Sequence, residues 1–148
     1  MVYFIMFFTA FCSATVLPMG SEAVLIYNVH QGYGLYLLFS IAVIGNTLGS
    51  YVNYYLGYKG EEYLVRKNIL KEHKIEKYKQ HFDKYGGFTL LLSWIPVFGD
   101  GFTFIAGILR YCQIKFFIYV FIAKFLRYFV LIVLYYNFEQ QILEYLDL

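Results

Sequence analysis

Long hydrophobic runs make up most of this chain, and short polar interruptions divide them into arms and spans. Residues 3–17 form an apolar run that would be about 22 Å long as a helix, too short for a hydrocarbon layer of about 30 Å. Pro18 and Gly20 end this run, and a second short arm covers about residues 23–29. Two short arms around a polar elbow predict a re-entrant hairpin, which enters and leaves the membrane on the same side. The alternative is one kinked transmembrane helix over residues 1–29.

Residues 35–56 are the first stretch long enough to span a membrane, at about 33 Å as a helix. Asn46, Ser50 and Asn53 recur at i, i+4 and i+7, so they share one face of this helix. Such a face packs closely on another helix, with amides as interhelical hydrogen-bond donors, or lines a polar cavity. The two interpretations are compatible.

A hydrophilic connector follows at residues 58–85 and holds eight of the twelve basic residues. Its apolar residues follow a 3-4-3 spacing typical of an amphipathic helix on a membrane surface: Ile75, Tyr78, Phe82 and Tyr85. The excess of Lys and Arg predicts a cytoplasmic location. We expect Gly86 and Gly87 to end this helix.

Two further short arms, at residues 88–95 and 102–111, flank a second break that contains Pro96, Gly99 and Gly101. Neither arm is long enough to cross a bilayer alone, and the proline and glycines disfavour a continuous helix. The pattern therefore predicts a second re-entrant hairpin, with Pro96, Gly99 and Gly101 at its elbow.

Residues 116–138 form the second predicted span, and it carries Lys124 and Arg127 one turn apart near its middle. A cation at this depth cannot easily reach an interface, so both should face protein or a water-filled cavity and find anionic partners.

The two halves of the chain correspond at an offset of 78 residues, which relates Pro18 to Pro96 and Glu22 to Asp100. Each half has a hairpin followed by one span, so the second half starts on the opposite side of the membrane. The sequence thus predicts one all-α integral membrane domain over residues 1–148. It contains two inverted repeats, at about 1–57 and 86–138, joined by a cytoplasmic amphipathic helix.

Composition excludes an ordinary soluble domain, because 60% of the residues are hydrophobic, 15% are charged and mean hydropathy is +0.55. A net charge of +2 with mixed signs in the connector argues against a nucleic-acid partner. Cys12 and Cys112 have no neighbouring ligands at metal spacing, and His73 and His81 are expected to be solvated. We expect no metal and no cofactor.

Four ionisable residues fall inside the elements predicted to be embedded in the membrane: Glu22, Asp100, Lys124 and Arg127. Their charges sum to zero, and the cost of burying a charge predicts mutual pairing. The group is either a structural clasp between the hairpin tips and the second span, or a site for an anionic or zwitterionic headgroup or for protons. Hydrolase motifs are missing from the sequence, so we expect no enzymatic activity.

Several motifs in combination resemble the YqaA-like branch of the DedA family, whose domain is called the VTT or SNARE-associated domain. These motifs are FCSATVLPMGSE at 11–22, IGNTLG at 44–49 with Asn53 and Leu56-Gly57, LLSWIPVFGD at 91–100 with Ala106-Gly107, and KFLRY at 124–128. The chain departs from better-studied members in two respects. They carry arginines at the positions of Ser93 and Gly99, and they carry an acid before the first elbow, whose counterpart here, near Ala10, is uncharged.

The resemblance implies a multi-pass protein of the bacterial inner membrane with two re-entrant hairpins in inverted repeats. It also implies a flippase or scramblase that supports envelope homeostasis, with membrane lipids as partners and protons as a candidate coupling ion. Our first hypothesis is therefore translocation of a phosphate-bearing lipid, with Lys124 and Arg127 on the phosphate and Glu22 and Asp100 tuning the site. The alternatives are a solute or ion transporter and a structural membrane subunit, and self-association into a homo-oligomer stays open.

From the sequence alone, replacing Glu22 or Asp100 by Ala should abolish activity at unchanged abundance in the membrane, because an embedded carboxylate is expensive unless it serves the site. Activity and abundance measured on the same membranes check this. Loss of abundance would instead favour the structural clasp.

Overall fold

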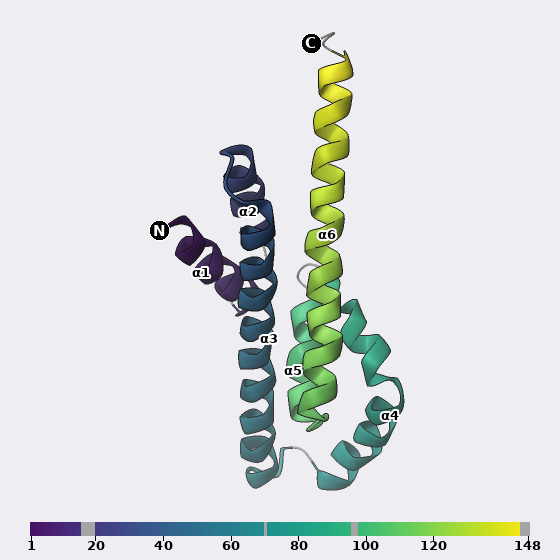
Figure 1. Cartoon of the computed structure of the whole chain (residues 1–148). Coiled ribbons are helices and arrows are strands. Elements are labelled where there is room, and N and C mark those ends of the chain that lie inside the picture. The colour runs from purple at the N-terminus through teal and green to yellow at the C-terminus, as the bar shows by residue number, and fades with distance from the viewer. Residues whose placement is uncertain (16–19, 70, 96–97, 146–148) are drawn as a thin grey trace.

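The computed structural model describes residues 1–15, 20–69, 71–95 and 98–145, and all regular secondary structure in these ranges is helical (Figure 1). The elements are α1 (Val2–Thr15), α2 (Ser21–His30), α3 (Leu35–Arg66), α4 (Glu72–Leu91), the short 3₁₀ helix η1 (Leu92–Trp94), α5 (Gly99–Ile108) and α6 (Gln113–Tyr145). Within the described part of the chain, α3 and α6 are long and apolar enough to cross a membrane. The prediction of an all-helical protein with two candidate spans is confirmed.

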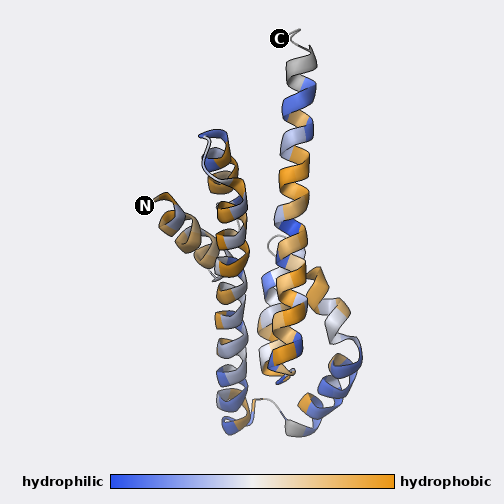
Figure 2. Cartoon of the chain, in the orientation of Figure 1, coloured by the Kyte–Doolittle hydropathy of each residue, from blue (hydrophilic) through white to orange (hydrophobic). Residues whose placement is uncertain are grey.

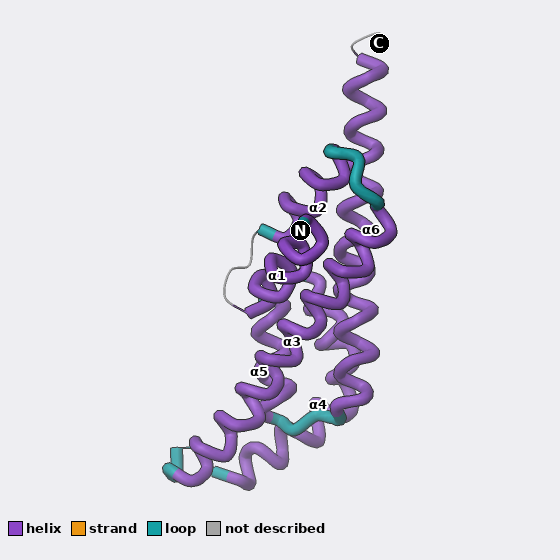
Figure 3. The backbone as a smooth tube through the Cα atoms, turned by 60° about the vertical axis from the view of Figure 1, so that its left-hand side comes forward, coloured by secondary structure: helices purple, strands orange, loops and turns teal. Residues whose placement is uncertain are grey.

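The two long helices stand side by side and run in opposite directions (Figures 1 and 3). The helices α1 and α2 pack against the upper half of α3, and α5 lies against its lower half. The helix α4 rises along the outside of α5 and α6 and leads into η1. The long helices therefore form a common frame, on which the shorter helices of each half are mounted.

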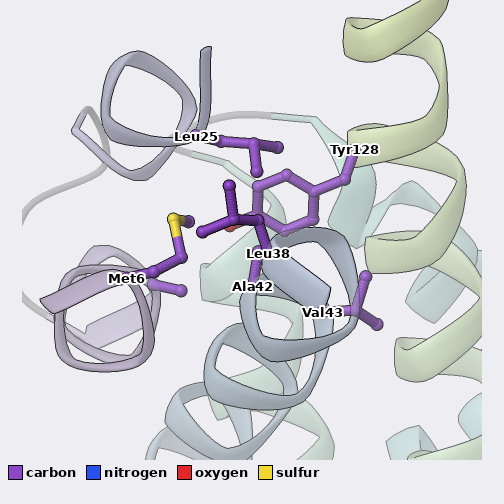
Figure 4. Packing of buried hydrophobic residues seen from close by; sticks show 7 residues of the cluster. Met6, Leu25, Leu38, Ala42, Val43 and Tyr128 are labelled. Carbon is purple, nitrogen blue, oxygen red and sulfur yellow. The ribbon is translucent and has the colours of Figure 1, made fainter. Parts of the chain in front are cut away.

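Two buried hydrophobic clusters hold this arrangement together. The upper cluster joins α1, α2, α3 and α6, and Figure 4 shows its members from these four helices: Met6, Leu25, Leu38, Ala42, Val43 and Tyr128. The lower cluster joins α3, α4, α5 and α6 through Tyr54, Leu90, Ala106, Tyr111, Phe116 and Val120. Because each cluster takes residues from both long helices, packing within the protein fixes how they sit together.

Glycines set the closest helix crossings. A Cβ atom on Gly57 of α3 would clash with the carbonyl oxygen of Phe104, and one on Gly107 of α5 would clash with the carbonyl oxygen of Tyr54. The two glycines thus let each backbone lie against the other. Gly49 does the same for α3 and α1. Small residues of this kind permit close packing of membrane helices, where side-chain hydrophobicity gives little driving force.

The first long helix continues beyond its predicted end. The predicted span ends at Leu56, whereas α3 runs on to Arg66. The extension carries Glu61, a buried residue that forms an ion pair with Arg110 of the α5–α6 connection. This tertiary contact stabilises a charged stretch that the sequence assigns to the surface. The expected connector over 58–85 is therefore divided between the end of α3 and the beginning of α4.

The sequence predicted that Gly86 and Gly87 end the amphipathic helix, and this prediction is wrong. Both lie inside α4, so the arm expected at 88–95 begins as the last turn of this helix and continues as η1. Added Cβ atoms would lie 3.2 Å from the ring of Tyr111 and 2.6 Å from the ring of Tyr119. These glycines make room for the rings of Tyr111, in the α5–α6 connection, and Tyr119, on α6, instead of terminating a helix.

The second elbow is also shorter than predicted. Gly99 and Gly101 were expected in the break, but α5 begins at Gly99 and contains both. A Cβ atom on Gly99 would clash with the carbonyl oxygen of Ser93, so this glycine lets the chain return closely past η1. Pro96 lies outside the described residues.

The first elbow separates two helices that lie against each other. Gly20 directly precedes α2, and Glu22 therefore belongs to the first turn of that helix. Met6 of α1 and Leu25 of α2 belong to the same buried cluster, so the helices do not continue one another as a single kinked rod would. Pro18 lies outside the described residues.

Replacing Gly57 by Ala should lower the thermal unfolding midpoint in detergent, because the added methyl group would force α3 and α5 apart, at a cost of about 1–3 kcal/mol. Gly60 is the matched control on the same helix, since nothing lies within 4 Å of a Cβ added there. Gly60→Ala should leave the midpoint unchanged or raise it, because alanine favours a helix by about 0.5–1 kcal/mol over glycine. Equal shifts for the two variants would contradict the close crossing.

Candidate functional site

The four charged residues singled out from the sequence come together as two ion pairs on one helix. Lys124 and Arg127 lie one turn apart on α6. The Nζ atom of Lys124 lies 2.8 Å from Oδ1 of Asp100, and the guanidinium of Arg127 pairs with the carboxylate of Glu22. The helix α6 thus binds the first turn of α5 through one pair and the first turn of α2 through the other.

The Lys124–Asp100 pair is the more deeply buried. The Lys124 side chain is 0% exposed and the Asp100 side chain is 16% exposed. The hydroxyl of Ser50 on α3 donates a second hydrogen bond to Oδ1 of Asp100, at 3.3 Å. Asp100 also lies in the first turn of α5, where the helix dipole favours a negative charge. Three elements therefore meet at this carboxylate.

The Arg127–Glu22 pair is slightly more open, with side chains 9% and 22% exposed. Glu22 lies in the first turn of α2, so it occupies the same position in its helix as Asp100 does in α5. The neighbouring Ser21 hydroxyl is 3.4 Å from Oε2 of Glu22. In both pairs the cation is the buried partner, and the carboxylate keeps more exposed surface.

A hydrogen-bonded chain connects this site to the upper core. The hydroxyl of Tyr128, one residue after Arg127, donates to Oγ of Ser21 at 2.9 Å. Ser21 Oγ in turn lies 3.1 Å from Oγ of Ser13 on α1. Asn46 of α3 donates to the Tyr128 hydroxyl at 3.2 Å. The chain thus links α1, α2, α3 and α6 beside the ion pair of Glu22.

The polar face predicted on the first span makes hydrogen bonds between helices. Asn46 and Asn53 donate to the backbone carbonyl groups of Ala10 and Ala14 on α1, at 3.1 and 2.7 Å. Ser50 bonds the carboxylate at the start of α5. The face therefore joins helices as interhelical glue, and a cavity lined by the same three residues stays a prediction.

Two buried polar atoms in this region have no hydrogen-bond partner among the described residues. They are Oδ1 of Asn46 and Oγ of Ser93. Buried polar atoms in native proteins are usually satisfied by protein or by ordered water. Both atoms therefore offer hydrogen-bonding capacity that the ion pairs do not use.

Sequence reasoning missed Ser13, Ser21 and Tyr128. Two of them could have been found from their positions beside charged residues. Ser21 directly precedes Glu22, and Tyr128 lies four residues after Lys124, on the same face of the helix. The partner of Ser21 on α1 gives no such signal, because contact between α1 and α2 depends on how the chain folds back.

A third ion pair lies apart from the site, at the end of the molecule where α3 and the α5–α6 connection meet. Nε and one terminal nitrogen of Arg110 both lie 2.8 Å from Oε2 of Glu61. The Glu61 side chain is 9% exposed, whereas that of Arg110 is 42% exposed. The hydrogen bond to Glu61 raises the pKa of the Arg110 guanidinium above its usual value, so the residue stays charged.

Comparison with known proteins gives a consistent match to one family. A family model described as the VTT domain matches residues 17–137. The inner membrane protein YqaA of Escherichia coli (strain K12) is 38% identical over 108 residues, which cover 72% of each chain, and the protein of the same name in Shigella flexneri matches equally. An uncharacterized protein of Haemophilus influenzae is 39% identical over 113 residues, covering 71% of this chain and 69% of its own. No solved structure matches the chain.

The burial of Lys124 changes what a single substitution can test. Asp100→Ala leaves a fully buried ammonium without its carboxylate, so we expect a loss of about 3–5 kcal/mol in the free energy of unfolding. The double variant Asp100→Ala/Lys124→Met removes both charges and should recover most of this loss. Thermal unfolding in detergent measures both.

The exposed pair Lys59–Glu62 is the control, with side chains 52% and 45% exposed. Glu62→Ala should cost less than about 1 kcal/mol. An Asp100→Ala effect as small as that of Glu62→Ala would show that Lys124 does not depend on its partner.

Proposed function

Since the chain belongs to the VTT-domain family of membrane proteins, we propose that it is a multi-pass protein of the bacterial inner membrane that moves a phosphate-bearing lipid between leaflets. The observation that carries this proposal is the pairing of Lys124 and Arg127 with two carboxylates on one helix. We propose no catalytic step for this protein, and its proposed partners are the membrane lipids themselves.

The depth of the two cations supports a role in transport. Lys124 and Arg127 lie 11 and 14 residues after Gln113, about 17 and 21 Å along α6, close to the middle of the apolar stretch that ends at Gln141. Figure 2 shows a hydrophilic interruption about midway along this helix, within its hydrophobic stretch. Each charge at the centre of a bilayer costs at least about 2.5 kcal/mol, and such residues commonly mark the path of a substrate, an ion or a proton.

The chemistry of the pairs suits the exchange of a carboxylate for a phosphate. Arginine binds a phosphate through two parallel hydrogen bonds, and lysine binds it as a compact charge. A lipid phosphate that approaches from the more exposed side meets Glu22 and Asp100 first. Protonation of either carboxylate would release its cation to the phosphate, which gives protons a direct way to control binding.

Several helix boundaries support two repeats with the predicted offset of 78 residues. The helix α2 covers Ser21–His30 and α5 covers Gly99–Ile108, so both ends of the two helices differ by that number. The helices α3 and α6 begin at Leu35 and Gln113, which are also 78 residues apart. The backbone has positive φ angles at corresponding positions, 82° at Gly32 and 50° at Arg110.

We extend the proposal to the membrane topology. Each half has short helices followed by one span, and α2 and α5, with ten residues each, are about 15 Å long, half of a hydrocarbon layer of about 30 Å. Their first turns carry Glu22 and Asp100 and meet the middle of α6. This arrangement supports re-entrant hairpins whose tips reach the centre of the membrane, in two inverted halves.

The competing interpretation is a clasp that only holds the fold. The full burial of Lys124 favours it, because a buried cation needs its partner whether or not a substrate binds. A site is supported by Asn46 Oδ1 and Ser93 Oγ, which have no hydrogen-bond partner among the described residues and could each contact a polar ligand.

Transport by the double variant separates the two interpretations. We expect vesicles with the wild-type protein to move fluorescent phospholipids or polyprenyl-phosphate lipids between leaflets faster than empty vesicles. Vesicles with folded Asp100→Ala/Lys124→Met should lose this movement, because the phosphate has lost one of its two cations. The control is Lys59→Met/Glu62→Ala, which removes an exposed pair and should transport normally.

Full transport by the Asp100→Ala/Lys124→Met variant would make the pair a clasp. Wild-type protein that is folded but moves no lipid would overturn the proposal itself. Flux of a soluble compound that depends on a pH gradient would instead indicate a solute transporter.

A further inference from the structure

Two adjoining hollows lie beside α4, away from the two ion pairs of α6. The first is a groove of about 440 Å³ between α4 and α5, with a mostly apolar lining that includes Tyr78, Phe82, Tyr85, Thr89, Ile105 and Leu109. The second is a pocket of about 470 Å³ with a charged lining that includes Glu61, His73, Glu76, Lys79, Leu109 and Arg110. Leu109 lines both, so the apolar groove and the charged pocket meet at this residue.

The lining of the two hollows changes from charged, at one end of the molecule, to apolar further along α4. The charged pocket lies where the end of α3, the beginning of α4 and the α5–α6 connection come together, at one end of the molecule (Figure 1). The groove continues from there along α4, which is hydrophilic at its beginning and hydrophobic toward its end (Figure 2). From Tyr78 to Thr89 it follows 11 residues, about 17 Å of helix, which is close to one leaflet of a hydrocarbon layer about 30 Å thick.

The charged pocket contains both signs in equal number. Its cations are Lys79 and Arg110, and its carboxylates are Glu61 and Glu76. Glu61 uses one oxygen to hold Nε and one terminal nitrogen of Arg110. A guanidinium has five N–H groups, so Arg110 keeps donors for a second acceptor while Glu61 fixes its position.

The backbone of Arg110 points to a function for this side chain. Its φ angle of 50° lies in the left-handed region, where the corresponding residue of the first half is Gly32 with a φ angle of 82°. Glycine adopts this conformation freely, whereas other residues adopt it at a cost that is often associated with functional sites. Here this conformation occurs at a partly exposed cation that lines the pocket.

We propose that the groove and the pocket together bind one phospholipid with an ammonium headgroup, taken from the adjacent leaflet. Its phosphate contacts Arg110 and Lys79, its ammonium group contacts Glu76, and one acyl chain lies along the groove past Leu109. The equal numbers of cations and carboxylates match a headgroup that carries both charges, and the apolar groove matches a chain of one leaflet. The inference rests on the proposed function only in its choice of a membrane lipid as the ligand.

Native mass spectrometry of the full chain tests this with phosphatidylethanolamine and phosphatidylcholine of equal chain length. We expect the wild-type protein to retain phosphatidylethanolamine in preference to phosphatidylcholine. Lys79→Ala and Arg110→Gly should each weaken retention about tenfold, the effect of one charge-assisted hydrogen bond. The Arg110→Gly variant also carries Glu61→Gln, so that no buried carboxylate is left without its cation, and glycine is the residue that the backbone prefers at position 110.

The matched control is Lys74→Ala, because Lys74 is an exposed lysine on the same helix, outside both hollows. It should retain phosphatidylethanolamine like the wild type. Equal losses for Lys74→Ala and Lys79→Ala, or no loss for Lys79→Ala, would overturn the site. Equal retention of the two lipids would overturn the ammonium contact. Equal retention of a six-carbon and a sixteen-carbon lipid, or displacement by inorganic phosphate, would show a site for a soluble phosphate instead.

Lipid movement in vesicles distinguishes this inference from the proposed function. A wild-type protein that retains phosphatidylethanolamine but moves no lipid would overturn translocation and leave the binding site. A Lys79→Ala variant that retains the lipid and also moves it would overturn the site and leave translocation.

Discussion

A lysine ammonium with no exposed surface is stable only beside a carboxylate, and this requirement organises the centre of the molecule. Lys124 has its partner in Asp100, whose position in the first turn of α5 fixes that helix against α6. Ser50 extends the same contact to α3. The Lys124–Asp100 pair lies within the second half of the chain. The Arg127–Glu22 pair joins the second half to the first. The charges that are most expensive to bury are thus the ones that join the parts.

The hydrophobic core and the polar site share residues, so neither can change alone. The ring of Tyr128 lies in the upper cluster with Met6 and Leu25, while its hydroxyl bonds Ser21 and accepts from Asn46 (Figure 4). An aromatic ring in a core usually needs a partner for its polar end. Here that partner is the residue next to Glu22. Repacking of the cluster would therefore move the ion pair, and opening of the ion pair would disturb the packing.

Much of this organisation follows from the sequence, because embedded charges are rare and must find each other. The four residues that pair were all identifiable from their positions in apolar runs. Which cation meets which acid was not, since this depends on where α2 and α5 cross α6. The mistaken helix ends have a similar cause. Gly86 and Gly87 carry the local pattern of a terminator, but the rings of Tyr111 and Tyr119 that pack on them lie more than 20 residues further along the chain. Local propensity yields to tertiary packing at such positions.

Lys124 and Arg127 lie on a single turn of α6, so this one turn binds both helices that carry the acids, α2 and α5. A shift of α6 by one residue along its axis would move both cations by 1.5 Å and, with the rotation of the helical repeat, swing them by about 100°. Hydrogen bonds to charged groups tolerate only a few tenths of an ångström. Neither α2 nor α5 could therefore keep its pair through such a shift while the other lost it. An axial shift of α6 would therefore break both pairs together, although their two acids lie 78 residues apart in the sequence.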